Sequence, residues 1–210
     1  MLTLYDCATA PSPRRARILL AEKGVPYEAV QIDLRKGEQF GAAFREVNPQ
    51  CTVPALRTEE GPVLTDNAAI AAYLEARYPE PALLGRTPLE HAEIASWHWR
   101  AEFEGLLAIA EALRNSSPAM VNRALPGPDD YPQIPDLAQR GLARAQHFFS
   151  ALDERLKDRD FIAAGAFSIA DITAVVAVDF ARVVKLKPAE QLANVGRWRE
   201  RLGQRASMRG

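Results

Sequence analysis

The segment from Asn48 to Asn67 constrains this chain more than any other, because it places a proline inside an apolar, strand-like sequence. Residues 53–56 read Val-Pro-Ala-Leu, yet proline cannot donate to a β-ladder and is tolerated only at the first residue or edge of a strand. If the Val53-Pro54 bond is cis, the backbone N–H and C=O of Val53 turn outward. They would then bind a peptide-like ligand through main-chain hydrogen bonds, as an added strand does.

A helix start follows this strand-like segment. Thr65, Asp66 and Asn67 are good capping residues, and the sequence after them has apolar residues at helical spacing: Ala68, Ile70, Ala71 and Leu74. The first N–H groups of a helix have no partner within the helix and suit an anionic ligand. A bend that binds peptide backbone, followed by a helix start that binds a carboxylate, would fit a small anionic peptide.

The beginning of the chain predicts a βαβ unit. Leu2–Tyr5 reads as a strand, and Ser12-Pro13 as a helix opening with serine at the N-cap and proline at the first helical position. That helix is expected to stop at Gly24, and alternating apolar residues over Tyr27–Leu34 predict a second strand. Strand, helix and strand over about thirty residues should place the two strands parallel.

The next stretch predicts the rest of a small sheet. A helix is expected over Gly37–Val47, then an antiparallel hairpin of strands Pro54–Arg57 and Val63–Leu64, then a helix over Asn67–Arg77. The order βαβ followed by ββα gives a mixed four-stranded sheet. We expect this first domain to cover residues 1–79, and the proline-rich residues 80–88 to form a linker.

The remainder, residues 89–210, predicts an all-α helical bundle. Apolar residues recur at helical spacing in four segments, with a long loop containing five prolines over Asn115–Pro135: Leu89–Arg114, Asp136–Lys157, Ile169–Val184 and Ala189–Leu202. Ser168 and Asp171 form a capping-box pattern at the start of the third and most apolar of these helices. We expect that helix to be the buried centre of the domain.

Composition restricts the function classes. The chain has 26 basic and 27 acidic residues, which gives no electrostatic reason to expect nucleic acid or a membrane surface as a partner. No apolar run approaches the ~20 residues that span a bilayer, and the first residues lack the pattern of a signal peptide. Two cysteines and three scattered histidines offer no disulfide framework and no metal-ligand spacing. We expect a cytoplasmic protein without a metal.

The motifs together resemble the cytosolic glutathione S-transferases, and specifically a bacterial serine- or threonine-type or atypical member. The resemblance rests on Val-Pro-Ala-Leu, a short turn, and Leu-Thr-Asp-Asn-x-x-Ile-x-x-Tyr-Leu, together with the opening Leu-Tyr-Asp and the helix from Arg14 to Gly24. It covers essentially the whole chain. It implies an α/β thioredoxin-like N-terminal domain followed by the helical domain, and glutathione as a co-substrate with no other cofactor.

The resemblance also implies a glutathione-binding set. Val53 and Pro54 would align the cysteinyl backbone of glutathione, Asp66 would pair with the γ-glutamyl ammonium, and Asn67 would meet the γ-glutamyl carboxylate. The family usually has Glu-Ser or Gln-Ser in place of Asp66-Asn67, and both residues have capping their own helix as the alternative role. Two further polar residues, Lys36 and Gln39, fall where relatives contact the glycyl carboxylate.

The residue that activates the glutathione thiol is left open among several. A free thiol has a pKa near ~8.5, so a hydrogen-bond donor must stabilise the thiolate near neutral pH. Serine-type members carry their hydroxyl at the position of Ala10, where this chain has none. Ser12 at the helix start is our first candidate and Thr9 the second, with Cys7 or a backbone N–H as alternatives. Capping the helix is the competing role for Ser12.

We predict from these residues an enzyme that conjugates the glutathione thiolate to a hydrophobic electrophile, which is detoxification chemistry. Arg100, Phe103 and Tyr131 are candidates for the second-substrate pocket, although Phe103 and its aromatic neighbours have core or dimer packing as an alternative. The resemblance implies a homodimer. Rival interpretations are a glutathione-dependent thiol transferase, an ether-cleaving, dehalogenating or isomerising relative, and a non-catalytic binding or regulatory module.

Overall fold

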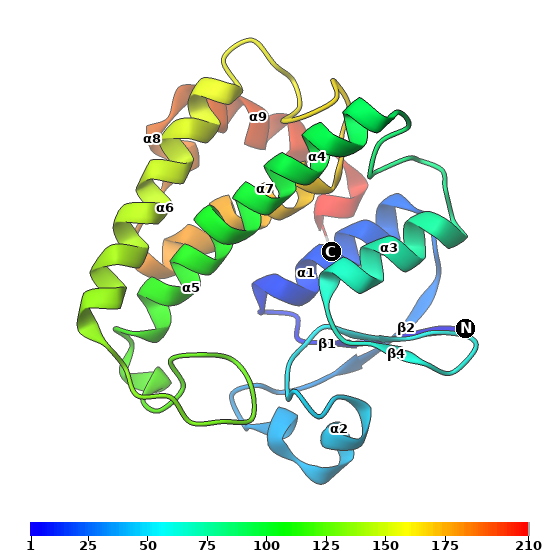
Figure 1. Cartoon of the computed structure of the whole chain (residues 1–210), viewed down its shortest axis with the longest axis vertical. Coiled ribbons are helices and arrows are strands. Elements are labelled where there is room, and N and C mark those ends of the chain that lie inside the picture. The colour runs from blue at the N-terminus through cyan, green and yellow to red at the C-terminus, as the bar shows by residue number, and fades with distance from the viewer. Residues whose placement is uncertain (210) are drawn as a thin grey trace. The chain divides into compact units, whose positions relative to one another are not determined.

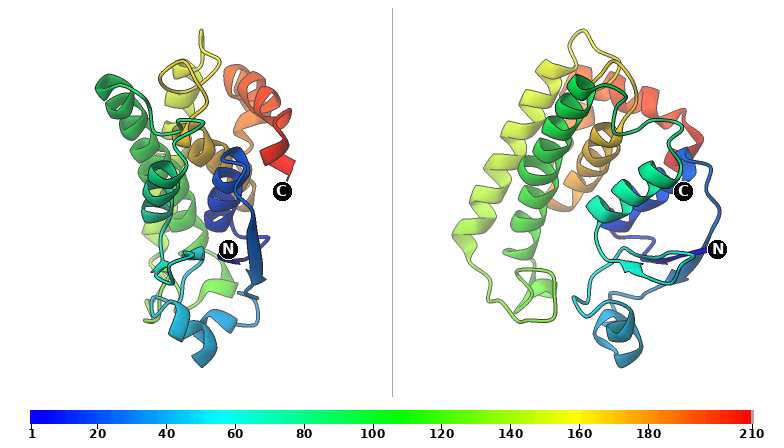
Figure 2. Two further views of the ribbon diagram at one scale, coloured as in Figure 1. Left: turned by 90° about the vertical axis from the view of Figure 1, so that its right-hand side faces the viewer. Right: turned by 45° about the vertical axis from the view of Figure 1, so that its right-hand side comes forward.

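The structure is a computed structural model in which residues 1–209 are described, and it falls into two compact units. The first unit comprises residues 1–81 and 126–129, and the second comprises residues 82–125 and 130–209. Each unit is described by itself below, with the elements labelled as in Figure 1 and seen from two further directions in Figure 2. None of the helices within residues 1–209 is both long and apolar enough to cross a bilayer.

The first unit is built on a four-stranded sheet of order β2-β1-β3-β4, formed by β1 (Leu2–Asp6), β2 (Tyr27–Gln31), β3 (Ala55–Arg57) and β4 (Val63–Leu64). β1 pairs parallel with β2, and the β1–β3 and β3–β4 pairs are antiparallel. The predicted mixed sheet is therefore confirmed. β2 ends at Gln31 and not at Leu34 as expected, because Asp33 caps the turn that follows by accepting from the N–H groups of Arg35 and Lys36.

Helices cover both faces of this sheet. α1 (Pro11–Glu22) and α3 (Asn67–Arg77) lie side by side on one face, and α2 (Ala42–Val47) lies on the other (Figures 1 and 2). Leu2, Leu4 and Leu56 of the sheet are buried, as are residues of α1 and α3, whereas Phe44 of α2 is buried in a cluster with Val53, Ile32 and Cys7. α1 ends before Gly24, which adopts a left-handed φ of 63° that favours glycine after a helix.

Two helix predictions in this unit are wrong in detail. α1 begins two residues earlier than expected: Ala10 is the N-cap, Pro11 takes the first helical position and Ser12 lies in the first turn, so Ser12 does not cap the helix. The earlier proline suits the first position equally well. The helix expected over Gly37–Val47 is divided into a 3₁₀ turn η1 (Glu38–Phe40) and α2, because Gly41 between them is extended, with ψ 152°.

The second unit is helical, as predicted. Its elements are α4 (Pro88–Arg100), α5 (Leu107–Arg114), α6 (Pro135–Arg155), α7 (Ile169–Phe180), α8 (Pro188–Gln191) and α9 (Ala193–Gly203), with 3₁₀ turns η3 (Pro118–Met120), η4 (Ala181–Val184) and η5 (Ala206–Arg209). α7 is buried along its length from Ile169 to Val178 and forms the centre of the unit. α5 and α6 approach closely at Gly141, where an added Cβ would lie 2.6 Å from the carbonyl oxygen of Ala108.

The predicted helix boundaries need two corrections here. The helix expected over Leu89–Arg114 contains a π-helical segment η2 (Ala101–Leu106) between α4 and α5. The helix expected over Ala189–Leu202 is divided into α8 and α9, because Leu192 is extended with φ −119° and ψ 114°. Apolar spacing alone does not reveal either irregularity, since the buried positions continue on both sides of it.

Candidate functional site

The residues predicted to bind a ligand in the first unit gather where three elements begin or end. β1 leads into the loop Cys7–Ala10 and then into α1, while β3 starts after Pro54 and pairs antiparallel with β1 through Tyr5 and Ala55. Because the strands run in opposite directions, the end of β1 lies at the same edge of the sheet as the start of β3. Cys7 and Val53 accordingly share one buried cluster.

The Val53-Pro54 peptide bond, whose isomer the sequence left open, is cis. Val53 and Pro54 are buried, and the loop before them is tied down by Asn48. The Asn48 side-chain amide donates to the carbonyl oxygen of Thr52 at 2.8 Å and to its hydroxyl oxygen at 3.1 Å. The backbone leading to Val53 therefore has a fixed conformation, which suits recognition through main-chain hydrogen bonds.

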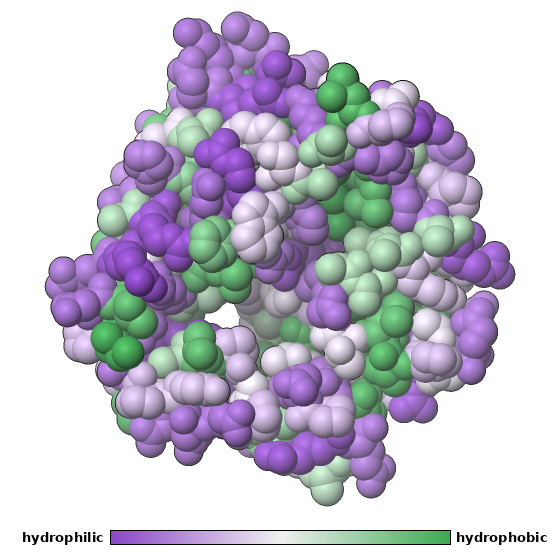
Figure 3. Space-filling model, in the orientation of Figure 1, coloured by the Kyte–Doolittle hydropathy of each residue, from purple (hydrophilic) through white to green (hydrophobic). Residues whose placement is uncertain are grey.

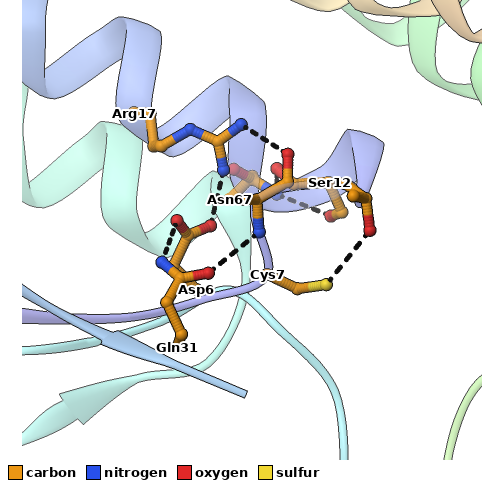
Figure 4. Close-up of polar contacts among 8 residues, drawn as sticks. Asp6, Cys7, Ser12, Arg17, Gln31 and Asn67 are labelled. Atoms are coloured by element: carbon orange, nitrogen blue, oxygen red, sulfur yellow. Dashed lines mark hydrogen bonds and ion pairs between the residues drawn. The ribbon is translucent and has the colours of Figure 1, made fainter. Parts of the chain in front are cut away.

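The start of α3 presents Asp66 and Asn67 in different roles. Asp66 is the N-cap, and its Oδ1 accepts from the Ala69 N–H at 2.8 Å. Asn67 is the first helical residue, and its Nδ2 donates to Ser12 Oγ at 3.0 Å and to the Ser12 carbonyl oxygen at 3.3 Å (Figure 4). The N–H groups of Asn67 and Ala68 have no partner within the helix by helix geometry, so they suit an anion.

Ser12 is half-buried, and both of its described hydroxyl contacts come from donors. Asn67 Nδ2 is one of them, and Arg15 NH2, at 3.1 Å, is the other. Two donors occupy the two lone pairs of the hydroxyl oxygen, so the hydroxyl proton remains for a third partner that accepts. An amide and a guanidinium that polarise the oxygen also make its O–H a better donor.

The loop before α1 holds the other two candidates for thiol activation. Cys7 Sγ lies 3.6 Å from Thr9 Oγ1, as drawn in Figure 4. The Cys7 side chain is buried and Thr9 is exposed. Cys7 follows β1 directly and faces the cluster of Val53, Ile32 and Phe44, which is the packing expected of a small buried residue.

Sequence reasoning missed a group of polar residues that surrounds this loop. Asp6 at the end of β1 is buried, and it binds Arg17 of α1 and Gln31 of β2; these two residues in turn bind the backbone of Ala8 (Figure 4). The partners lie 9 to 25 residues apart in the sequence, and no short motif connects them. The only signal available was a buried-strand pattern that ends on an aspartate, Asp6.

The two residues expected at the glycyl carboxylate are placed differently from each other. Lys36 is exposed in the turn after β2, where its Nζ lies 3.6 Å from a carboxylate oxygen of Asp33. Gln39 lies in η1 with 2 % of its surface exposed, and its Oε1 has no hydrogen-bond partner among residues 1–209. Gln39, which fell within the helix expected over Gly37–Val47, therefore stands in the 3₁₀ turn and not on α2.

The candidates for a second-substrate pocket belong to the second unit, and each has its own partners. Arg100 Nε lies 3.1 Å from Glu104 Oε2, and its guanidinium stacks over Trp97 at 4.4 Å. Phe103 stacks on Trp99 with ring centroids 5.1 Å apart, while Tyr131 forms backbone hydrogen bonds within the loop before α6. Phe103 and Tyr131 are 44 % and 43 % exposed.

The capping box in the second unit is confirmed and is wholly buried. Asp171 accepts from four donors: the N–H of Ile162 at 3.1 Å, the N–H and the hydroxyl of Ser168, and Trp198 Nε1 at 3.0 Å. Burial raises the pKa of Asp171 to about 6, against the opposing effect of these hydrogen bonds. Within residues 1–209, no group of three or more histidine, cysteine, aspartate or glutamate side chains gathers as metal ligands.

Comparison with known protein families matches both parts of the chain. Residues 9–77 match the glutathione S-transferase N-terminal domain, and residues 118–206 match the glutathione S-transferase C-terminal domain. The chain is 33% identical over 211 residues to glutathione S-transferase 2 of Saccharomyces cerevisiae, with 99% of this chain and 88% of the yeast protein covered.

Two further relatives extend the comparison. The crystal structure of a glutathione S-transferase domain-containing protein from Marinobacter aquaeolei superposes with a TM-score of 0.88 at 33% identity, covering 98% of this chain and 99% of that one. The maleylacetoacetate isomerase of Pseudomonas aeruginosa is 43% identical over 93 residues, which covers 43% of this chain and 44% of the isomerase.

Proposed function

Because the chain belongs to the glutathione S-transferase family, we propose that it binds glutathione and catalyses attack of the glutathione thiolate on a hydrophobic electrophile. The observation that supports this most is the hydrogen bonding of Ser12, whose hydroxyl accepts from Asn67 and Arg15 and keeps its proton for an acceptor. A thiolate is such an acceptor. The chemistry then consists of populating the thiolate near neutral pH and aligning it with the second substrate.

In this proposal the tripeptide lies along the edge of the sheet of the first unit. The backbone of Val53 pairs with the cysteinyl backbone, and the free N–H groups of Asn67 and Ala68 at the start of α3 bind the γ-glutamyl carboxylate. Asp66 is exposed, and of its two carboxylate oxygens only Oδ1 accepts a described hydrogen bond, the one that caps α3. The carboxylate can therefore also pair with the γ-glutamyl ammonium. Capping and binding are compatible because a carboxylate has several acceptor sites.

The glycyl end of glutathione is assigned to Lys36 and Gln39. Lys36 is exposed and paired weakly with Asp33, so its ammonium is available to a carboxylate. Gln39 carries a buried oxygen without a described partner. A buried acceptor without a partner is costly, and the group at this end of glutathione that can donate to it is the glycyl N–H, whereas the glycyl carboxylate suits Lys36.

We propose that the second substrate is hydrophobic and can carry an aromatic ring, and that Tyr131 is one of the residues that contact it. Arg100 is engaged by Glu104 and Trp97, so it contributes only if that pairing opens. For Phe103, a protein interface competes with substrate binding as the role of the side chain. Trp99, Phe103 and Leu107 follow one another at intervals of four residues and are 60 %, 44 % and 46 % exposed.

These three residues favour a homodimer as the assembly. Hydrophobic side chains form separate patches among hydrophilic ones on the face shown in Figure 3. A stacked Trp99–Phe103 pair beside an exposed leucine is the composition found at the cores of protein interfaces. Light scattering should give twice the 23.1 kDa mass of one chain, and charge substitution at Trp99 and Phe103 together should reduce it to one.

The function is tested by calorimetric titration of glutathione and by turnover with an activated aryl chloride. Wild-type protein is expected to bind glutathione and to release chloride as the thioether forms. Asp66→Ala should weaken binding, because it removes the carboxylate that pairs with the γ-glutamyl ammonium. Asn67→Ala should weaken it too, because it removes the amide that holds the start of α3 against Ser12. If the wild type binds no glutathione, the enzyme proposal is wrong and the fold serves a binding role, an alternative that Ala10 at the position of the usual serine supports.

A thiol transferase is the second candidate, and the contact of Cys7 Sγ with Thr9 Oγ1 at 3.6 Å is the observation that favours it. The Cys7 thiolate would attack the glutathionyl sulfur of a mixed disulfide and expel the other thiolate. A second glutathione would then reduce the Cys7–glutathione disulfide and leave as glutathione disulfide. Cys7→Ser should abolish this reaction and leave conjugation of the aryl chloride intact. The isomerase relative suggests a third substrate class, although the Ser-Ser-Cys-like loop of such enzymes is absent here.

A further inference from the structure

We propose that Asp6, Arg17 and Gln31 form a positioning ring that holds the loop Cys7–Ala10 in the geometry needed to stabilise the glutathione thiolate. The proposal rests on the function proposed above, and it assigns a role in that function to residues set behind the loop. They are positioning residues, because they act on the thiol only through the backbone they hold.

The ring closes around the single residue Ala8. The Ala8 N–H donates to Gln31 Oε1 at 3.0 Å, and Arg17 NH2 donates to the Ala8 carbonyl oxygen at 3.2 Å. Asp6 joins the two side chains: Arg17 NH1 donates to Asp6 Oδ1 at 2.6 Å, and Gln31 Nε2 donates to Asp6 Oδ2 at 2.8 Å. Both backbone groups of Ala8 are thus bound by side chains from α1 and β2, as Figure 4 shows.

The exposure of Ala8 indicates that the ring does more than satisfy backbone groups. Ala8 is exposed, so water alone could satisfy its N–H and C=O. Instead, Arg17 and the buried carboxylate of Asp6 take part in holding Ala8. Ordering the arginine side chain costs conformational entropy. An arrangement of this kind fixes the orientation of the two peptide planes on either side of Ala8, which hydration would leave free.

The charges in the ring determine which residue types can occupy its three positions. The Asp6 side chain is 3 % exposed, so its carboxylate needs both a cation and full hydrogen bonding. Gln31 is the neutral member, and its partners fix its amide: the nitrogen faces Asp6 and the oxygen faces the Ala8 N–H. A glutamate at position 31 would oppose the Asp6 carboxylate, and a leucine would lose both hydrogen bonds.

Fixing Ala8 fixes the groups that face the thiol. Ala10 N–H donates to the Cys7 carbonyl oxygen at 2.9 Å, which closes the loop into a turn, and Ala10 is the residue from which α1 begins. Thr9 and the entry to the first turn of α1, which carries Ser12, therefore depend on the orientation of Ala8. A displacement of about 1 Å in such donors is enough to reduce a rate by up to about a hundredfold.

The test compares Gln31→Leu and Arg17→Met with wild type, and uses Glu28→Leu as a matched control. Glu28 is exposed on the same strand β2 and makes none of the ring contacts. The readout is the ultraviolet difference spectrum of the bound glutathione thiolate as a function of pH, together with the calorimetric Kd and the pH profile of kcat/KM. Circular dichroism reports whether each variant folds; if Arg17→Met does not, Gln31→Leu at its exposed site carries the test.

We expect both ring variants to bind glutathione with a Kd within about threefold of wild type. The pKa of the bound thiol should rise by about one unit, and kcat/KM at neutral pH should fall about tenfold and recover at higher pH. Glu28→Leu should match wild type. Unchanged thiol titration in the ring variants would show that the ring is structural only, while the proposed function stands. Absence of glutathione binding by the wild type would overturn both proposals.

Discussion

Two serines in this protein stand in the first turn or at the cap of a helix, and their surroundings give them different chemistry. Ser168 caps α7, is 1% exposed and shares a capping box with Asp171, to which its hydroxyl donates at 3.2 Å. Ser12 lies in the first turn of α1, is half-buried, and receives hydrogen bonds from Asn67 and Arg15. The proton of Ser168 is donated inside the protein, whereas no acceptor for the Ser12 hydroxyl proton is found among residues 1–209.

This difference separates a serine that stabilises a fold from one able to stabilise an anion. Sequence position does not make the distinction, because each residue stands at the start of a helix beside good helix-opening residues. The partner chemistry makes it: an acceptor beside Ser168 consumes its O–H, while donors beside Ser12 leave the O–H to a ligand. Substitutions around the two serines should therefore affect different observables.

The largest effect is expected from Asp171→Ala in the second unit. The substitution leaves four buried donors, on Ile162, Ser168 and Trp198, without their acceptor. We expect the free energy of unfolding to fall by about 3–5 kcal/mol. Urea unfolding followed by tryptophan fluorescence measures it. A loss below about 1 kcal/mol would mean that the capping box is not the stabilising centre of the unit.

The pH dependence of stability should also depend on Asp171. Its folded pKa of about 6 lies above the ordinary value of 3.8, so the folded state holds this proton more tightly than the unfolded state. Protonation of Asp171 therefore contributes roughly 3 kcal/mol to the free energy of unfolding. This contribution is fully present below pH 3.8 and is lost as the pH rises through about 6. The free energy of unfolding of wild type should therefore fall relative to that of Asp171→Asn as the pH rises through this range, because asparagine does not titrate. A constant difference would contradict it.

Asn67→Ala should have a smaller effect on stability and a visible effect on the ligand. It removes the amide that donates to Ser12 at 3.0 Å, but leaves the Asp66 cap of α3 in place. We expect a stability change of about 1 kcal/mol and roughly tenfold weaker glutathione binding, measured by calorimetry. Binding equal to wild type would mean that the Asn67–Ser12 contact joins two helices and has no part in the site.

Much of the first unit could be predicted from its sequence. The parallel strands and the helix over Asn67–Arg77 follow from spacing, proline and capping residues, which act over a few positions. The capping box of the second unit was predictable for the same reason. The start of α1 was predicted two residues too late, because Pro11 and Pro13 both suit a first helical position and Ser12 is a better capping residue than Ala10. The division of the second helix at Gly41 depends on one extended residue within otherwise helical spacing.

The candidate site was predictable only where one segment supplies it. A single segment, Asn48–Asn67, contains four of the candidate residues, and its motif predicts them together: Val53, Pro54, Asp66 and Asn67. The ring of Asp6, Arg17 and Gln31 joins three elements across 11 and 25 residues, so only the folded sheet brings it together. The donors around Ser12 were likewise hidden, because Asn67 lies 55 residues away from it.

The most direct test of the central claim is the thiolate difference spectrum of bound glutathione in Ser12→Ala and Ser168→Ala, each beside wild type. We predict that wild type and Ser168→Ala both show thiolate at neutral pH. Ser12→Ala should bind glutathione but show the protonated thiol, because its replacement has no proton to donate. If Ser12→Ala keeps the thiolate, the Ser12 hydroxyl does not activate glutathione, and Thr9 or a backbone N–H of the loop takes its place.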